Sequence, residues 1–146
     1  MDPQELDTIP GLASALRTTT LRLARRLRQV RADSLELTGN QLSAMGVLLN
    51  AGDQLMGELA AAEKIRPPSM TRIVNGLEER GLVARKPDPR DRRQCLVTLT
   101  EPGRELLLAN RRRRDQWLAQ QLADLDPEEI DTLRRAVLIL DRVHRG

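Results

Sequence analysis

The feature that most constrains the fold is a change in the spacing of apolar residues near residue 82. Residues 67–80 place apolar side chains at i, i+3, i+4 and i+7, the spacing of a half-buried helix; these are Met70, Ile73, Val74 and Leu77. The runs 82–86 and 96–99 are short and partly β-branched, and they flank a segment rich in Pro, Asp and Arg. This pattern predicts a β-hairpin with a charged tip directly after a helix.

Local signals predict two further helices before this one. Thr38 and Gln41 have the capping-box spacing, so a helix is expected over 39–50, ending at Gly52. A short helix is expected over 57–64. Pro67 and Pro68 then suit the first turn of the next helix, and Gly81 is placed to end it. The centre of the chain therefore reads as helix, short turn, helix and basic hairpin.

Long helices are expected on either side of this centre. One covers 10–32, with a single stripe formed by Leu12, Leu16, Leu23, Leu27 and Val30. A second covers 101–123, with Thr100 as its N-cap, and Trp117 is expected to pack among these helices. A third begins at Asp126-Pro127 and bears Ile130, Leu133, Val137 and Leu140 on one stripe. Such stripes need a partner surface.

Composition narrows the class of protein. The chain has 146 residues, which is the size of a single domain. It contains one Trp and no Tyr or Phe, so a base-stacking surface for single-stranded nucleic acid is not expected. One Cys and one His exclude a disulfide framework and a zinc cluster within the chain, and this cysteine usage favours a reducing, cytoplasmic compartment. No apolar run is long enough to span a membrane, and the acidic N-terminus does not resemble a signal peptide.

The net charge of +3 is unevenly distributed. It is −2 over residues 1–63, +5 over 64–94, +3 over 95–114 and −3 over 115–146. A basic centre between acidic ends indicates a polyanion-binding segment between segments with another role.

The second helix of the central pair presents groups suited to reading DNA. On a helical projection its outward face contains Pro68, Arg72, Asn75, Gly76 and Glu79, with Ser69 and Thr71 beside it. Arg can bond guanine through two hydrogen bonds and Asn can do the same with adenine, while Ser and Thr suit phosphate or the thymine methyl group. The alternative is an ordinary amphipathic helix with a polar face.

The hairpin tip concentrates positive charge, since Arg90, Arg92 and Arg93 follow two prolines. An Arg side chain gains energy from the negative potential of a narrow minor groove. Asp91 is unfavourable next to DNA unless it orients a neighbouring Arg through an ion pair. The alternative is a solvated turn.

These segments together resemble one family. Residues 67–83, then Asp88-Pro89-Arg90-Asp91-Arg92-Arg93 and Leu99-Thr100-Glu101-Pro102-Gly103, closely resemble the MarR (multiple antibiotic resistance regulator) family. The resemblance implies a mainly α fold with a small β-hairpin wing (α+β), a winged helix-turn-helix, and a homodimer that binds double-stranded DNA. It implies one domain over 1–146, with residues 37–99 binding DNA and residues 5–34 and 101–145 forming the dimerisation helices.

The resemblance also implies roles for single residues. Arg93 would enter the minor groove with Asp91 orienting it, and Ser69, Thr71, Arg72 and Asn75 occupy positions that commonly face DNA. We expect a transcriptional regulator, most simply a repressor, released by a small aromatic or phenolic effector whose carboxylate Arg17 would meet. The alternative is a winged-helix protein-interaction module without specific DNA binding.

Other residues are expected to have no chemical role. Cys95 is predicted to be a small buried hydrophobe rather than a redox sensor. His144 is expected to be solvated, and the run Arg111–Arg114 to form a solvated helix face or to touch flanking DNA. We find no phosphate loop, metal-ligand spacing or nucleophile elbow, so we expect no enzyme, cofactor or metal.

Overall fold

The computed structural model describes residues 3–31 and 36–146. The chain divides into two compact units. One comprises residues 32–111, and the other comprises residues 1–31 together with 112–146. Helix α5 (Glu101–Leu122) begins in the first unit and ends in the second.

The 32–111 unit begins with three helices that match the sequence predictions: α2 (Gly39–Ala51), α3 (Met56–Ala62) and α4 (Pro67–Glu79). The predicted capping box is present, because Gln41 N donates to Thr38 Oγ1 (3.1 Å) and Thr38 N donates to Gln41 Oε1 (2.9 Å). Gly52 ends α2 with a φ of 81°, and Gly81 follows the end of α4 with a φ of 71°. Both angles lie in the region that favours glycine.

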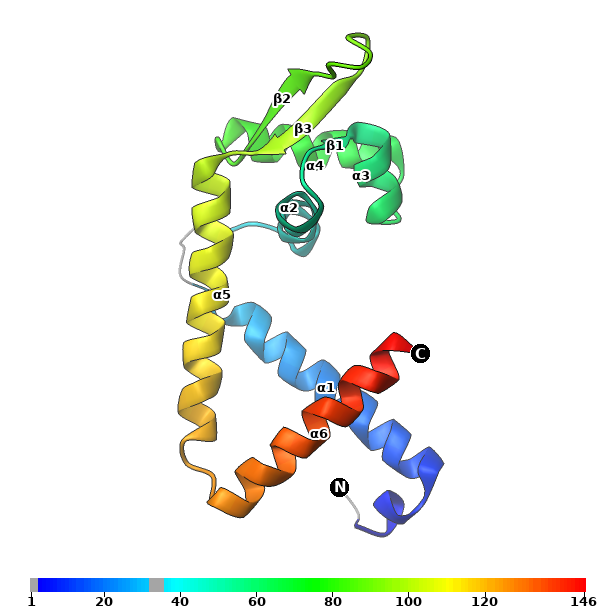
Figure 1. The fold of residues 1–146 in the computed structure, drawn as a ribbon, viewed down its shortest axis with the longest axis vertical. Helices are drawn as coiled ribbons and strands as arrows, with labels where there is room; N and C mark the ends of the chain where they lie inside the picture. Colours follow the sequence, from blue (N-terminus) through cyan, green and yellow to red (C-terminus); the bar gives the residue numbers. More distant parts are fainter. Residues whose placement is uncertain (1–2, 32–35) are drawn as a thin grey trace. The chain divides into compact units, whose positions relative to one another are not determined.

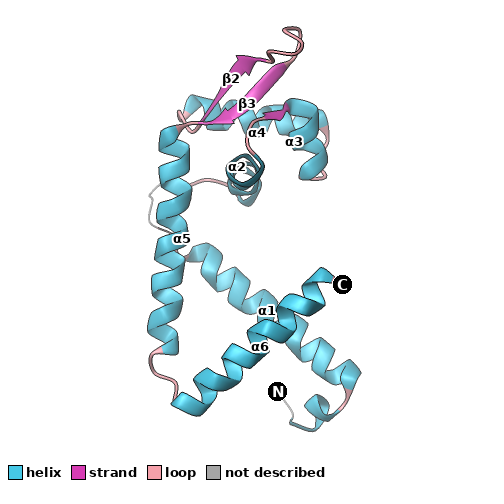
Figure 2. Cartoon of the chain, in the orientation of Figure 1, coloured by secondary structure: helices cyan, strands magenta, loops and turns pink. Residues whose placement is uncertain are grey.

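The strands of this unit form one antiparallel sheet in the order β1-β3-β2 (Figure 2). Strands β2 (Val83–Pro87) and β3 (Cys95–Leu99) form the predicted hairpin, in which Arg85 pairs with Val97. Strand β1 (Gln54–Leu55) was not predicted, because two residues are too few to show a period. Figure 1 shows the hairpin extending away from the three helices of its unit.

A compact aliphatic core holds the helices of this unit against the sheet. Side chains of Met45, Leu59, Met70, Val74, Leu77, Val83 and Val97 are completely buried. The predicted stripe of α4 is therefore confirmed, with Ile73 half-buried at its margin. Each such side chain contributes about 1.5–3 kcal/mol by leaving water, so the orientation of α4 is firmly fixed.

The other unit contains a short 3₁₀ helix, η1 (Pro3–Asp7), α1 (Ile9–Gln29), α6 (Pro127–Arg145) and the C-terminal part of α5. Asp126 and Glu129 form a capping box at the start of α6, where the sequence predicts that the helix begins. Neither α1 nor α6 buries any of its described residues within the chain. Large apolar side chains are exposed on both helices, among them Ile9 (79%), Val137 (62%), Leu138 (70%) and Val143 (70%).

Two contacts connect α1 to α5 within this unit. Arg114 Nε donates to the carbonyl oxygen of Leu27 (3.1 Å) in the last turn of α1. The guanidinium of Arg26 lies 5.6 Å from the centroid of the half-buried Trp117 ring, a cation–π contact. Arg114 therefore does not belong to a wholly solvated face: it adds a second hydrogen bond to the Leu27 carbonyl, which also accepts from Val30 N (3.0 Å).

The helix predicted over 10–32 ends at Gln29, because Val30 has an extended backbone conformation, and residue 32 lies outside the described residues. The expectation for Cys95 is wrong, because this residue is exposed, not buried. It is the first residue of β3, opposite Pro87, and burial in this strand begins only at Leu96. His144 is exposed, as expected. In the described part of the chain no helix is long and apolar enough to cross a membrane, and no three acidic, His or Cys side chains gather in a way that suits a metal ion.

Candidate nucleic-acid interface

Helix α4 presents a continuous polar face on the surface of its unit. Because Met70, Val74 and Leu77 are directed into the core, the residues between them are left outside. The exposed residues include all those predicted on this helix: Pro68, Ser69, Thr71, Arg72 and Asn75. Gly76 is the exception on the projected face. It is half-buried, and a Cβ there would lie 2.9 Å from Gln41 Nε2 of α2.

Some polar groups on this face already have partners within the unit. The Thr71 hydroxyl donates to the carbonyl oxygen of Pro67 one turn earlier (3.0 Å). Asn75 Oδ1 accepts a short hydrogen bond from Nη2 of Arg85 on β2. The same guanidinium forms an ion pair with Glu78, with Nη1 3.2 Å from Oε1. Sequence reasoning missed Arg85, since nothing local connects it to a residue ten positions earlier.

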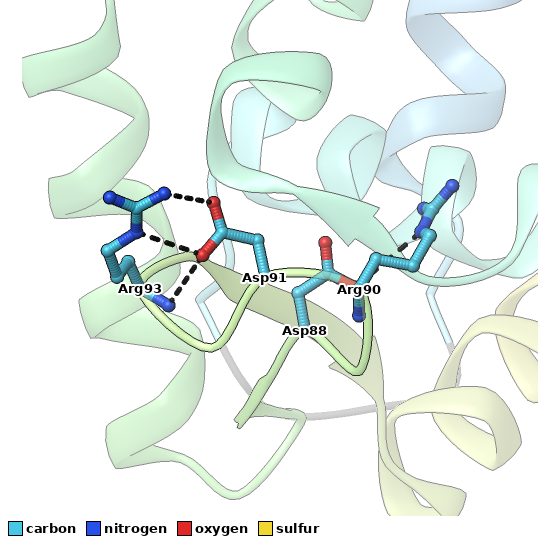
Figure 3. Close-up of polar contacts among 4 residues, drawn as sticks. All are labelled: Asp88, Arg90, Asp91 and Arg93. Atoms are coloured by element: carbon cyan, nitrogen blue, oxygen red, sulfur yellow. Dashed lines mark hydrogen bonds and ion pairs between the residues drawn. The ribbon is translucent and has the colours of Figure 1, made fainter.

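The wing is the loop 88–94 together with strands β2 and β3. At its tip Asp91 Oδ1 accepts from the backbone N of Arg93 (3.1 Å) and from its Nε (3.2 Å), and Asp91 Oδ2 lies 3.5 Å from Nη2 (Figure 3). The Arg93 side chain is nevertheless 91% exposed. The expected contact between these two residues is therefore present, and it orients the guanidinium while leaving it accessible.

A second aspartate shapes the start of the loop. Asp88 is almost completely buried (3%) and its Oδ1 accepts from the backbone N of Arg90 (3.0 Å). Asp88 and Asp91 thus each bond the backbone two residues later, which is the Asx-turn arrangement. Figure 3 shows the guanidinium groups of Arg90 and Arg93 on opposite sides of the loop. Sequence reasoning missed Asp88, although an Asp before a Pro is a turn signal.

An ion pair supports the base of the wing. Lys86 Nζ on β2 lies 2.6 Å from Oδ2 of Asp53, the residue that precedes β1. The hydrogen bond from Lys86, aided by one from Thr98, holds the pKa of the Asp53 carboxyl below its ordinary value. The pair spans β3 and connects the two outer strands of the sheet.

The predicted effector contact, Arg17, is exposed on α1. It borders a shallow hollow of about 220 Å³, together with Thr18, Leu21, Arg22 and Arg25. Three guanidinium groups along one helix face form a locally positive surface.

A short helix, a turn, a second helix with an exposed polar face and a basic β-hairpin define a winged helix-turn-helix protein. A sequence profile of the MarR family matches residues 35–94. The uncharacterized HTH-type transcriptional regulator Mb0904 of Mycobacterium bovis is 47% identical over 131 residues, which cover 90% of this chain and 91% of the relative. The chain therefore belongs to the MarR family of transcriptional regulators, which are not enzymes.

Solved structures support the fold along the whole chain. A MarR family protein from Bacillus stearothermophilus superimposes with a TM-score of 0.77 at 27% identity, covering 100% of this chain and 99% of that one. The F27L mutant of MepR from S. aureus, solved bound to an oligodeoxyribonucleotide, superimposes with a TM-score of 0.72 at 19% identity, covering 90% of this chain and 96% of that one.

Proposed function

We propose that the protein binds a pseudo-palindromic operator in double-stranded DNA as a homodimer, with α4 in the major groove and the wing in the minor groove. The observation that carries this proposal is the exposed, Asp-oriented Arg93 at the tip of the wing, in the same unit as the exposed polar face of α4. An Arg fixed in this way loses less conformational entropy when it enters a groove. The MepR mutant, which shares the fold, was solved bound to an oligodeoxyribonucleotide, and this supports a role for the fold in binding DNA.

The dimer is proposed from the surfaces of α1 and α6. Apolar side chains such as Ile9, Leu138 and Val143 are more than two-thirds exposed. Monomeric proteins rarely leave contiguous apolar surface uncovered, and a second copy with two-fold symmetry would cover it. Such a dimer places half-sites about one helical turn apart, roughly 10 bp.

The sign of regulation that we propose is repression, in which the bound dimer occupies promoter DNA inside the bacterial cell. Repression needs only the DNA-binding surface, whereas activation needs an additional contact with polymerase. We further propose that a small aromatic or phenolic acid releases the protein, with its carboxylate at Arg17. The positive surface formed by Arg17, Arg22 and Arg25 supports an anionic ligand.

The test is the affinity for selected operator DNA as a function of salt, measured for the wild-type protein, R93A and R104A. Arg104 is an exposed residue of α5 in the same unit, so R104A removes the same charge without altering the wing. We expect R93A to weaken binding by the dimer at least about tenfold, equivalent to about 1.4 kcal/mol. Because the homodimer loses one contact from each wing, the salt slope should fall by about 1.8. R104A is expected to bind nearly as the wild-type protein does. Equal affinities for R93A and the wild-type protein would refute the role of the wing.

A winged-helix module that binds only other proteins is the competing function. It predicts no sequence preference and a shallow dependence of DNA affinity on salt, whereas several phosphate contacts give a steep one.

A further inference from the structure

Arg85 joins the wing to the helix that we propose reads the major groove. We infer that Arg85 is a specificity-determining positioning residue: its guanidinium occupies Asn75 Oδ1, so Asn75 offers DNA its amide NH₂ and selects base edges that accept hydrogen bonds. This inference rests on the proposed DNA-binding function and adds to it a named residue and a base preference.

The chemistry of the two side chains fixes the orientation of the amide. A guanidinium has only donors, so its partner on Asn75 is the carbonyl oxygen Oδ1 and not the nitrogen. In the described part of the chain, Nδ2 of Asn75 has no hydrogen-bond partner, and the residue is exposed. The end of the amide that remains for a ligand is therefore the donor end.

The other terminal nitrogen of the Arg85 guanidinium, Nη1, also has a partner. It lies 3.2 Å from Oε1 of Glu78, one helical turn after Asn75 on α4. The side chains of Arg85 and Glu78 are only 29% and 40% exposed. Two bonds from one planar fork restrict the rotation of the guanidinium, which a single bond would not do. The pair also neutralises a carboxylate that would otherwise repel nearby phosphates.

The backbone between α4 and β2 keeps Arg85 within reach of Asn75. Gly81 turns the chain with a φ of 71°, and Leu82 N donates to the carbonyl oxygen of Leu77 (3.0 Å). The hydroxyl of Thr100 donates to the carbonyl oxygen of Gly81 (2.6 Å), which connects this turn to the start of α5. The strand and the helix are thus held at a fixed separation.

The consequence is a base preference set by the donor end of the Asn75 amide. The usual pairing of Asn with adenine needs both ends, with Oδ1 accepting from adenine N6 while Nδ2 donates to N7. With Arg85 bonded to Oδ1, Nδ2 remains, and it can donate to O6 or N7 of guanine, to N7 of adenine or to O4 of thymine. Cytosine presents only its N4 donor in the major groove. We therefore expect guanine, adenine or thymine at the base that Asn75 meets, and not cytosine.

The experiment selects binding sites from random duplex DNA with the full-length protein and its variants. N75A identifies the position that Asn75 reads, because preference there is lost. R85M should then weaken the preference at that same position at least about fivefold, the equivalent of the ~1 kcal/mol lower limit of a base-specific contact. R85K keeps the positive charge but lacks the planar guanidinium. Its base preference at this position should be intermediate between those of R85M and the wild-type protein.

K86M is the matched control, since Lys86 is the neighbouring residue of β2 and pairs with Asp53 instead of α4. It removes the same charge, so it should leave the preference at this position unchanged. N75D is the converse variant: it keeps an oxygen for Arg85 but replaces the donor by an acceptor. It should shift the preference towards cytosine or adenine, whose N4 and N6 amino groups donate. Thermal unfolding identifies any variant that is not folded.

The outcomes separate the inference from the proposed function. If the wild-type protein selects no motif, the proposed function fails. If the protein selects a motif in which the position read by Asn75 is cytosine, or in which R85M and K86M give the same profile, the operator-binding function stands and the role of Arg85 is refuted. Residual preference at this position in N75A that disappears when R85M is added would also refute it, because Arg85 would then act independently of Asn75.

Discussion

Gly103, in the first turn of α5, packs closely against the backbone of Leu82, the residue that precedes β2, and its substitution by Ala tests this packing. A Cβ at this position would lie 2.2 Å from the carbonyl oxygen of Leu82, 3.0 Å from its carbonyl carbon and 2.8 Å from Cδ1 of Leu99. Two of these three atoms belong to backbone, so no change of side-chain rotamer relieves the overlap. The start of α5 must move away from the start of β2, or the protein must unfold.

The size of the effect follows from two opposing terms. Overpacking of a rigid site costs about 1–3 kcal/mol, and a backbone overlap belongs at the upper end of this range. Replacing Gly by Ala in a helix stabilises the folded state by up to about 1 kcal/mol through helix propensity. We therefore expect G103A to lower the free energy of unfolding by about 2 kcal/mol, which with a urea m-value of about 2 kcal/mol/M lowers the midpoint by about 1 M.

Gly46 provides the matched control, because it lies in α2 and a Cβ there would meet nothing within 4 Å. G46A should raise the free energy of unfolding by about 0.5–1 kcal/mol, through helix propensity alone. The assay is urea unfolding followed by far-ultraviolet circular dichroism, at one protein concentration for all variants, since a dimer's stability depends on concentration. A G103A midpoint equal to or above that of the wild-type protein would refute the reasoning.

Three further predictions follow from named contacts. The ion pair with Lys86 stabilises the folded state only while the Asp53 carboxylate is charged, and this lowers the pKa of Asp53. As the pH drops below the ordinary Asp pKa, the free energy of unfolding should therefore fall more steeply for the wild-type protein than for D53N. Urea unfolding at several pH values measures both curves, and parallel curves would contradict this. R114A should lower the free energy of unfolding by about 1 kcal/mol, because it removes the side-chain hydrogen bond to the Leu27 carbonyl, which keeps only its bond from Val30 N. R113A, at the exposed neighbouring position, should lower it by less than about 0.5 kcal/mol in the same assay. D91N removes the ion pair that orients Arg93 and makes the net charge more positive by one. We expect lower operator affinity in fluorescence anisotropy, because orientation of Arg93 matters more than the added charge. An increase in affinity would show that the charge matters more than the orientation.

Locally encoded features were predictable from the sequence. The capping boxes at Thr38 and Asp126 begin helices where expected, because the groups that cap them lie three residues apart. The contact between Asp91 and Arg93 was equally accessible, since it spans only two residues. The core of the 32–111 unit followed from the apolar spacing of α4, which is dictated by the helical repeat.

Features that depend on distant segments were not predictable. The short β1 exists only because β3 provides a partner for it, and Arg85 meets Asn75 only after β2 folds back along α4. The error at Cys95 has a similar origin. At the end of a five-residue strand the sequence does not define which side chains the core covers, and here coverage begins at Leu96.

The central claim is that the chain recognises one DNA sequence through α4 and the wing. The most direct test is capture of fragmented genomic DNA by the purified wild-type protein, followed by sequencing, at low and at physiological salt. We predict one short palindrome, with half-sites about 10 bp apart, whose enrichment persists at the higher salt. Recovery that disappears with salt and contains no common motif would contradict sequence-specific recognition by this protein.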